Sequence, residues 1–217
     1  MLKSLYISFF IILFSTCYSQ DSENNYDAGE FKSDNILKTN PLAIIWGTIP
    51  YTAEYRLVLE SFTAPKQSLQ LGASYLGKSF ILRIIEKQDT NMYDLDLIVK
   101  GFRFQFAYKY YFNREKQDFG FYSGPLFSYS MAKFTNVYYK NSDEYIRATY
   151  INYNIIAGYQ TKIMDTFTFD IFTGLGYRDN YWIEKYNQTV STLDDSDMYV
   201  YDIPLKIIFG FNIGILL

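Results

Sequence analysis

The chain has 217 residues, a formal net charge of −3 and 20% aromatic residues, with 23 tyrosines and 19 phenylalanines. This length suits one all-β domain or compact barrel, and without a stretch rich in Lys and Arg we expect no nucleic-acid partner. The sequence contains no histidine and one cysteine, Cys17. These absences exclude histidine-based catalysis and Cys/His zinc sites.

The first 35 residues carry targeting signals. Residues 1–19 combine Lys3, the apolar run Leu5–Phe14 and a tail of small residues, which is the layout of a secretory signal peptide. The apolar run is too short for a spanning helix. An alternative interpretation makes Cys17 a lipidated cysteine. Residues 20–35 are polar, acidic and aperiodic, so we expect a flexible periplasmic N-terminal segment.

Residues 36–217 alternate apolar and polar side chains with a period of two, which predicts strands. The expected strands lie near 36–46, 53–60, 68–75, 101–112, 119–131, 151–160, 167–176 and 202–217. The first is the least regular, because Pro41 interrupts it. Gly124-Pro125 is a candidate bulge, and Pro204 fits the start of the last strand.

The connections between these strands alternate in length. Short polar turns are expected near Pro65, Glu115 and Asp165, and the link at Thr48–Pro50 between the first two strands is also short, whereas the other connections are long. The long segments lie near 77–98, 134–146 and 178–201. Short turns at one end and long loops at the other are typical of transmembrane β-barrels with an even number of antiparallel strands.

The stretch Gly101–Phe112 (G-F-R-F-Q-F-A-Y-K-Y-Y-F) has an aromatic side chain at every second position. A soluble lipocalin-like barrel would point this face inward, but an eight-stranded barrel has an interior just wide enough for ordinary side chains. Four to six aromatic and branched residues from each of about eight strands, Phe119 and Phe121 among them, would overfill this interior. Small residues opposite them instead leave inward room for Arg56, Arg103, Lys109 and Tyr122. We therefore expect the aromatic faces to contact lipid.

With these features the chain resembles the small outer-membrane β-barrels of Gram-negative bacteria, most closely the short Bacteroidota barrels of unknown function. The matching stretches are the leader ending S-Q, K-T-N-P-L at Lys38–Leu42, the Gly101–Phe112 strand and the closing P-L-K-I-I-F-G-F-N-I-G-I-L-L. The resemblance implies a closed antiparallel up-and-down transmembrane barrel of about eight strands over residues 36–217. It also implies an outer-membrane location, contact with membrane lipid and lipopolysaccharide, and insertion by the outer-membrane assembly machinery.

A group of charged side chains falls on the faces expected to point into the barrel. They are Glu54, Arg56, Glu60, Arg103, Lys109, Lys162, Asp170 and Lys206. Buried charges need partners, so we interpret them as a salt-bridged plug rather than a solute path. No serine–histidine arrangement exists, so we expect no enzyme, no cofactor and no metal site. The favoured role is structural, or binding of a protein partner outside the cell through the long loops; a narrow pore is the alternative.

Three further segments carry weaker signals. Asp194-Asp195-Ser196-Asp197 could bind calcium, although a charge run in a loop is usually solvated. The apolar segment Ser79–Ile85 favours an extension of the strands over a contact with a partner. Trp46 and Trp182 lie near strand ends, where tryptophan commonly anchors a barrel at the membrane interface.

Overall fold

The computed structural model describes residues 35–88, 96–112, 119–137, 144–193 and 204–217. The chain divides into Met1–Lys32 and a compact unit, Ser33–Leu217. The expected signal peptide, Cys17, the turn at Glu115 and the acidic run at 194–197 lie outside the described residues, as does nearly all of the expected periplasmic segment. No helix in the described part of the chain is long and apolar enough to cross a membrane.

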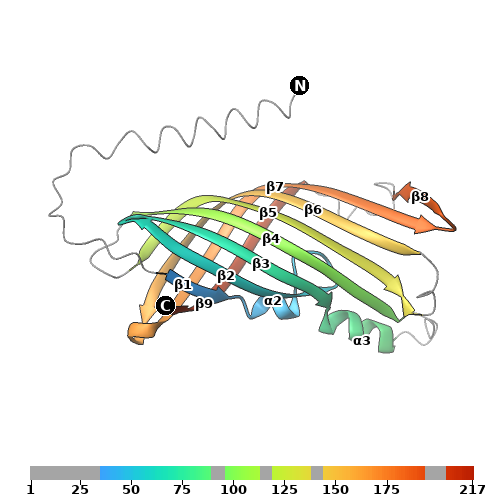
Figure 1. Ribbon diagram of the computed structural model, residues 1–217, viewed down its shortest axis with the longest axis horizontal. Helices are drawn as coiled ribbons and strands as arrows, with labels where there is room; N and C mark the ends of the chain where they lie inside the picture. Colours follow the sequence, from blue (N-terminus) through green and yellow to red (C-terminus); the bar gives the residue numbers. More distant parts are fainter. Residues whose placement is uncertain (1–34, 89–95, 113–118, 138–143, 194–203) are drawn as a thin grey trace, which may run out of the picture. The chain divides into compact units, whose positions relative to one another are not determined.

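Eight strands of Ser33–Leu217 close into an antiparallel ring in the order β1-β2-β3-β4-β5-β6-β7-β9 and back to β1 (Figure 1). Their bounds are β1 Asn35–Thr39, β2 Thr52–Ala64, β3 Gln67–Lys78, β4 Leu97–Tyr111, β5 Gly120–Asn136, β6 Tyr145–Ile163, β7 Phe167–Tyr186 and β9 Leu205–Leu216. The predicted closed eight-stranded barrel is therefore confirmed. Among the described strands, the short strand β8 (Thr189–Thr192) pairs with β7 alone.

The two ends of the barrel differ in their connections (Figure 1). At one end, β2 and β3 meet at Pro65-Lys66, and a single 3₁₀ turn, η2 (Met164–Thr166), joins β6 to β7. We call this the short-turn end. The opposite end, which we call the helix end, carries the helix α3 (Phe80–Gln88) and the β7–β8 hairpin.

Several predicted loops are strand in the structure. Strand β5 continues to Asn136, β6 begins at Tyr145, and β7 runs without interruption to Tyr186. Asn187 and Gln188, with φ of 46° and 65°, form the two-residue turn into β8. Positive φ at both central residues is the geometry that tight hairpin turns require. The strands therefore extend beyond the segments in which apolar and polar residues clearly alternate in the sequence.

The first strand is shorter than the predicted 36–46. It ends at Thr39, and Leu42–Ile45 forms a short helix, α2, with Pro41 at its N-cap at φ −64°. Proline has no N–H to donate to a strand ladder, and its fixed φ suits the start of a helix. Residues 52–57 of β2 consequently have a strand partner, β3, on one side only. On the other side the loop after α2 lies along them, with the Gly47 amide donating to the Thr52 carbonyl.

Three further local predictions were wrong. Ser79–Ile85 is not a strand extension, because most of it belongs to α3, whose Leu82 is buried while Phe80 and Ile85 are exposed. Phe119 was expected on the outer face but is buried, since Gly120 adopts φ 106° and turns the chain inward before β5. Gly124-Pro125 is not a bulge: the β4–β5 register is the same on both sides of it.

The two faces of the wall differ as predicted. Phe104, Leu71 and Phe209 point outward with 58%, 62% and 69% of their surface exposed, whereas Arg103 and Lys109 between the β4 aromatics are buried. A soluble carrier barrel would have its apolar faces pointing inward, and the described wall does not have this arrangement. The aromatic face of β4 points outward, as expected.

Candidate functional site: the polar interior

A group of charged side chains lies inside the barrel toward its short-turn end. This inner network consists of Lys38 from β1, Glu60 from β2, Lys109 from β4 and Asp170 from β7, with side chains at most 1% exposed. Lys38 Nζ pairs with Glu60 and donates to Asp170 Oδ2 at 3.0 Å. Lys109 Nζ lies 2.8 Å from Asp170 Oδ2 and 3.7 Å from Glu60 Oε2. Two ammonium groups thus face two carboxylates.

Neutral donors complete the coordination of both carboxylates. Tyr122 Oη donates to Asp170 Oδ1 at 2.6 Å, and Tyr111 Oη donates to Glu60 Oε1 at 2.8 Å. Further donors are Ser68 and Gln70 to Glu60, and Asn212 to Asp170. Buried charges are stable when they are paired and their remaining lone pairs accept hydrogen bonds. The inner network meets both conditions.

An aromatic cluster packs beside the inner network. The Phe62 ring lies 5.4 Å from Tyr111 and 5.3 Å from Phe119, and Tyr111 lies 5.4 Å from Tyr122. Lys109 Nζ sits 3.9 Å above the Tyr122 ring. Gly158 makes room for that ring, since a Cβ there would lie 2.6 Å from Tyr122 Cζ. We call Phe62, Tyr111, Phe119 and Tyr122 the aromatic seal; all four are at most 1% exposed.

A second polar group, the mouth cluster, surrounds Glu54 nearer the helix end. Arg56 Nε donates to Glu54 Oε1 at 2.8 Å, and Arg103 Nη1 donates to Glu54 Oε2 at 3.0 Å. Ser74 and Thr48 also donate to this carboxylate, at 2.7 and 3.0 Å. Thr48 lies on the loop after α2. The segment that takes the place of the second half of the predicted first strand therefore also contributes a side chain to the mouth cluster.

The mouth cluster has more positive than negative charge. Arg103 Nη2 and Asn152 Nδ2 both donate to Ser128 Oγ, and Lys206 Nζ donates to Asn152 Oδ1 at 3.0 Å. Lys206 thus joins the cluster through a neutral amide, and among the described residues it makes no ion pair with a carboxylate. Among the described residues, Glu54 is the one carboxylate of this cluster facing Arg56, Arg103 and Lys206, and the Lys206 side chain is partly exposed.

The structure places seven of the eight predicted interior residues in these two groups. Glu60, Lys109 and Asp170 belong to the inner network; Glu54, Arg56, Arg103 and Lys206 belong to the mouth cluster. Lys162 is half-buried near the short-turn end of β6, two residues beyond Gln160.

Sequence reasoning missed Lys38 of the inner network and two side chains that contact this network, Tyr111 and Gln160. Gln160 Oε1 accepts from Lys38 and Lys109 and lies 2.9 Å from Tyr111 Oη. Tyr111 follows Arg103 and Lys109 in steps of two, which could have placed it inward. Lys38 lies two residues after the buried Ile36, but the irregular 36–46 segment hid that alternation.

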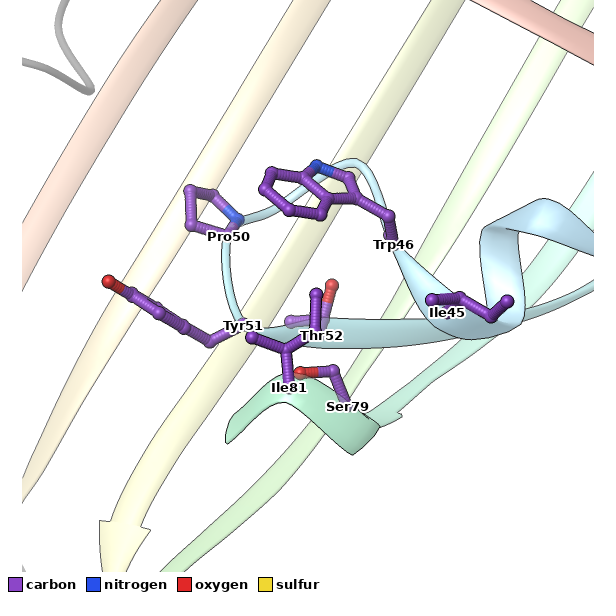
Figure 2. A pocket seen from close by; sticks show the side chains of 8 residues that line it. Ile45, Trp46, Pro50, Tyr51, Thr52, Ser79 and Ile81 are labelled. Carbon is purple, nitrogen blue, oxygen red and sulfur yellow. The ribbon is translucent and has the colours of Figure 1, made fainter. Parts of the chain in front are cut away.

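Trp46 and Trp182 lie in different environments. The Trp182 ring packs 6.4 Å from Phe134 and 6.0 Å from Tyr150, inside the barrel, so its predicted role as an interfacial anchor is wrong. Trp46 is 72% exposed on the loop after α2. With Ile45, Pro50, Tyr51 and Ile81 it lines a mostly apolar pocket of about 110 Å³ (Figure 2).

The chemistry available in the interior is electrostatic. Within the described residues no group of three His, Cys, Asp or Glu side chains is placed to hold a metal ion. The carboxylates of Glu54, Glu60 and Asp170 each accept bonds from cations and from hydroxyl groups. The fold and this site define a closed β-barrel with an apolar outer wall and a hydrogen-bonded, charged interior.

No protein-family model and no curated protein matches the chain. Among solved structures, the chain is similar to one described as the crystal structure of a major outer membrane protein from Thermus thermophilus, with 7% sequence identity and a TM-score of 0.45. The alignment covers 85% of this chain and 99% of that chain. At this level of similarity, the assignment of the fold depends on the strand pairing of the chain itself.

Proposed function

We propose that the protein is an integral outer-membrane β-barrel with an occluded interior and a non-enzymatic role, either structural or as a surface-interaction protein. Within that class, we propose that it belongs with the small barrels of Gram-negative bacteria, and in particular with the short barrels of Bacteroidota. The short-turn end would face the periplasm, and the helix end would face the outside, as in other barrels with one end of long connections.

The outer wall supports a location in a membrane. On β7, outward positions from Phe167 to Tyr177 carry Phe169, Ile171 and Leu175 between them. A tilted strand needs about 9–11 residues to cross the hydrocarbon. Strands β4 to β7 have 15, 17, 19 and 20 residues, so they can cross it and still project beyond. An exposed apolar wall of this extent is costly in water and favourable in lipid.

The observation that carries the occluded interior is the inner network. It joins β1, β2, β4 and β7 across the lumen through side chains at most 1% exposed. The aromatic seal lies beside it. Barrels of this size hold packed side chains, whereas open aqueous channels come with 16–18 strands. This arrangement favours a plug over a solute path.

The helix end supports the surface role. Trp46, Ile45 and Phe80 are at least half exposed there, on α2, on the loop that follows it and on α3. Large apolar side chains gathered at an exposed end are typical of contact sites for lipid or protein. The partner would meet the barrel at this end.

The location is tested by fractionating membranes and comparing boiled with unboiled protein on an SDS gel. We expect recovery in the outer membrane and faster migration of the unboiled protein, because a closed barrel resists SDS until heated. A soluble protein whose migration does not depend on heating would contradict the proposal.

Occlusion is tested by recording currents across planar bilayers. We expect no steady conductance from the native protein. The alternative function, a narrow pore for ions or small solutes, is favoured by the excess positive charge of the mouth cluster. Reproducible single-channel steps that disappear in Arg103→Met would establish that alternative. A variant of the seal, Tyr111→Ala with Phe119→Ala, should conduct, whereas the outward-facing control Tyr110→Ala should not.

A further inference from the structure

Three basic residues form a row across the outer wall near the helix end. Lys100 on β4 pairs with Lys133 on β5, and Lys133 pairs with Arg147 on β6. All three occupy outward-facing positions: Lys100 and Lys133 are exposed, and Arg147 is partly exposed. Strands β4, β5 and β6 lie side by side in the wall (Figure 1). We call these three residues the basic row.

No carboxylate of the described residues pairs with the basic row. Within the described residues, none of its three members forms an ion pair with a carboxylate, and the recorded side-chain contact is that of Lys133 Nζ, 4.2 Å above the Tyr145 ring. Like charges placed directly opposite each other on neighbouring strands repel. Asp179 on β7 faces outward, but it lies opposite Ile151, two outward positions nearer the short-turn end than Arg147, and accepts from Tyr181 Oη at 2.7 Å.

The basic row borders the apolar wall. One outward step toward the short-turn end, the cross-strand row is Phe102, Met131 and Thr149; the next is Phe104, Tyr129 and Ile151. Outward positions of β4 stay aromatic from Phe102 to Phe112. In a membrane, side chains at this border lie at the level of the lipid headgroups, where basic residues meet lipid phosphates.

The spacing of the basic row suits phosphate groups. Neighbouring strands lie about 4.8 Å apart, so three residues across two strand spacings cover roughly 10 Å. The ammonium groups act as mobile point charges, and the guanidinium of Arg147 can bind a phosphate through two parallel hydrogen bonds. A phosphorylated headgroup supplies the negative charge that the row lacks.

We propose that Lys100, Lys133 and Arg147 bind the phosphate groups of an anionic lipid in the leaflet at the helix end of the barrel. This inference rests on the proposed membrane location and assigns the lipid contact to one face, the outer surface of β4, β5 and β6. Each basic side chain close to an anionic membrane surface strengthens binding roughly fivefold.

The test uses the refolded full chain in vesicles of phosphatidylcholine with a minor fraction of phosphatidic acid. After solubilisation, native mass spectrometry counts the retained phosphatidic acid and phosphatidylcholine. The site variant carries Lys100→Gln, Lys133→Gln and Arg147→Gln. The matched control removes three cations elsewhere: Lys66→Gln in the β2–β3 turn, and Arg83→Gln with Lys87→Gln on α3. Each sample is also run unboiled on an SDS gel.

The native chain and the control should retain phosphatidic acid in preference to phosphatidylcholine, and the site variant should lose at least tenfold of that preference while still migrating as a folded barrel. Retention by the site variant equal to that of the native chain would overturn the lipid site, as would an equal loss in the control or a folded native barrel without preference. A chain that forms no heat-sensitive barrel would instead overturn the proposed function, and the lipid site with it.

Discussion

The inner network and the mouth cluster lie in the same barrel but differ in their balance of positive and negative charge. The inner network sets Lys38 and Lys109 against Glu60 and Asp170, and each of these side chains is at most 1% exposed. The mouth cluster sets three cations against one carboxylate, and Lys206 remains half-buried. A sealed interior needs charge balance because no water or ion can neutralise an excess, whereas a group nearer the opening can be solvated.

The same contrast separates a structural element from a binding surface. In the inner network, cations, hydroxyls and amides together coordinate two carboxylates. In the mouth cluster and in the basic row, the basic side chains outnumber the carboxylates that pair with them within the described part of the chain. We therefore expect substitutions in the inner network to act on stability, and substitutions in the basic row to act on lipid binding.

The largest effect is expected for Asp170→Asn. This change leaves Lys38 and Lys109 buried with Glu60 as their remaining carboxylate, and breaking a buried ion pair costs about 3–5 kcal/mol of unfolding free energy. Denaturant titration of the refolded barrel, read from the unboiled gel band, measures the loss. The matched control is Asp179→Asn on the same strand, which should change stability by less than about 0.5 kcal/mol. Equal losses in the two variants would contradict the contrast.

A smaller loss, about 2 kcal/mol, is expected for Glu54→Gln in the mouth cluster, because water can reach part of the excess charge there. Adding Lys206→Met should restore part of the lost stability, since it removes one of the unbalanced cations. A double-mutant cycle measures this coupling. A double variant less stable than Glu54→Gln alone would show that Lys206 is not repelled in the cluster.

Tyr122→Phe is expected to lower the unfolding free energy by about 1–2 kcal/mol, since it removes the hydroxyl that donates to Asp170 Oδ1 and keeps the ring beside Lys109. Tyr159→Phe, which removes an outward-facing hydroxyl, is the matched control and should have almost no effect. Destabilisation by the control of the same size would contradict a special role for the inner network.

The smallest effect is expected at the rim, where Lys78 pairs with Glu86 and Asp96. Burial lowers the pKa of Lys78, but hydrogen bonds to Asp96 and Glu86 outweigh it and raise that pKa above its ordinary value. The interaction of protonated Lys78 with these two carboxylates therefore stabilises the fold fully below about pH 10.4. This contribution is lost as pH rises through the higher folded-state pKa of Lys78. Lys78→Met should cost less than about 1 kcal/mol at pH 7.

Comparing stability at pH 9 and at pH 11.5 checks this assignment. The difference in stability between native protein and Lys78→Met should shrink at the higher pH, because the native protein then loses the same interaction. Lys87→Met, which removes an exposed cation from α3, is the control and should show no such convergence. A difference in stability that stays constant with pH would show that the ion pairs of Lys78 do not contribute to the pH dependence.

Much of the wall could be predicted from local pattern. Along Gly101–Phe112, adjacent side chains must point to opposite faces of a strand, so the alternation separated outward Phe104 from inward Arg103 and Lys109. The same rule placed Glu54, Glu60 and Asp170 inside before any contact was known. This rule could not predict which charges form pairs, because Lys38 and Asp170 are 132 positions apart in the sequence.

Three of the wrong predictions, for the first strand, for Phe119 and for Ser79–Ile85, share a physical cause, a local change in backbone conformation that interrupts the period of two. Pro41 starts a helix, so α2 replaces the upper part of the first strand. Gly120 turns Phe119 from the outer face into the aromatic seal. The apolar run after Ser79 folds as α3, because Leu82 can be buried at the rim while its neighbours stay exposed. Alternation carries no information about such positions.

The sequence by itself determined that the chain forms a β-barrel with apolar residues outside and charged residues inside, because a strand's side-chain period is local and the interior volume of a small barrel is limited. Only the tertiary structure decided how the charges are grouped. Strand register brings Lys38, Lys109, Glu60 and Asp170 to one level of the lumen, and places Lys100, Lys133 and Arg147 in one row outside. Register depends on pairing between distant segments, and that pairing separates the balanced interior from the unbalanced surface.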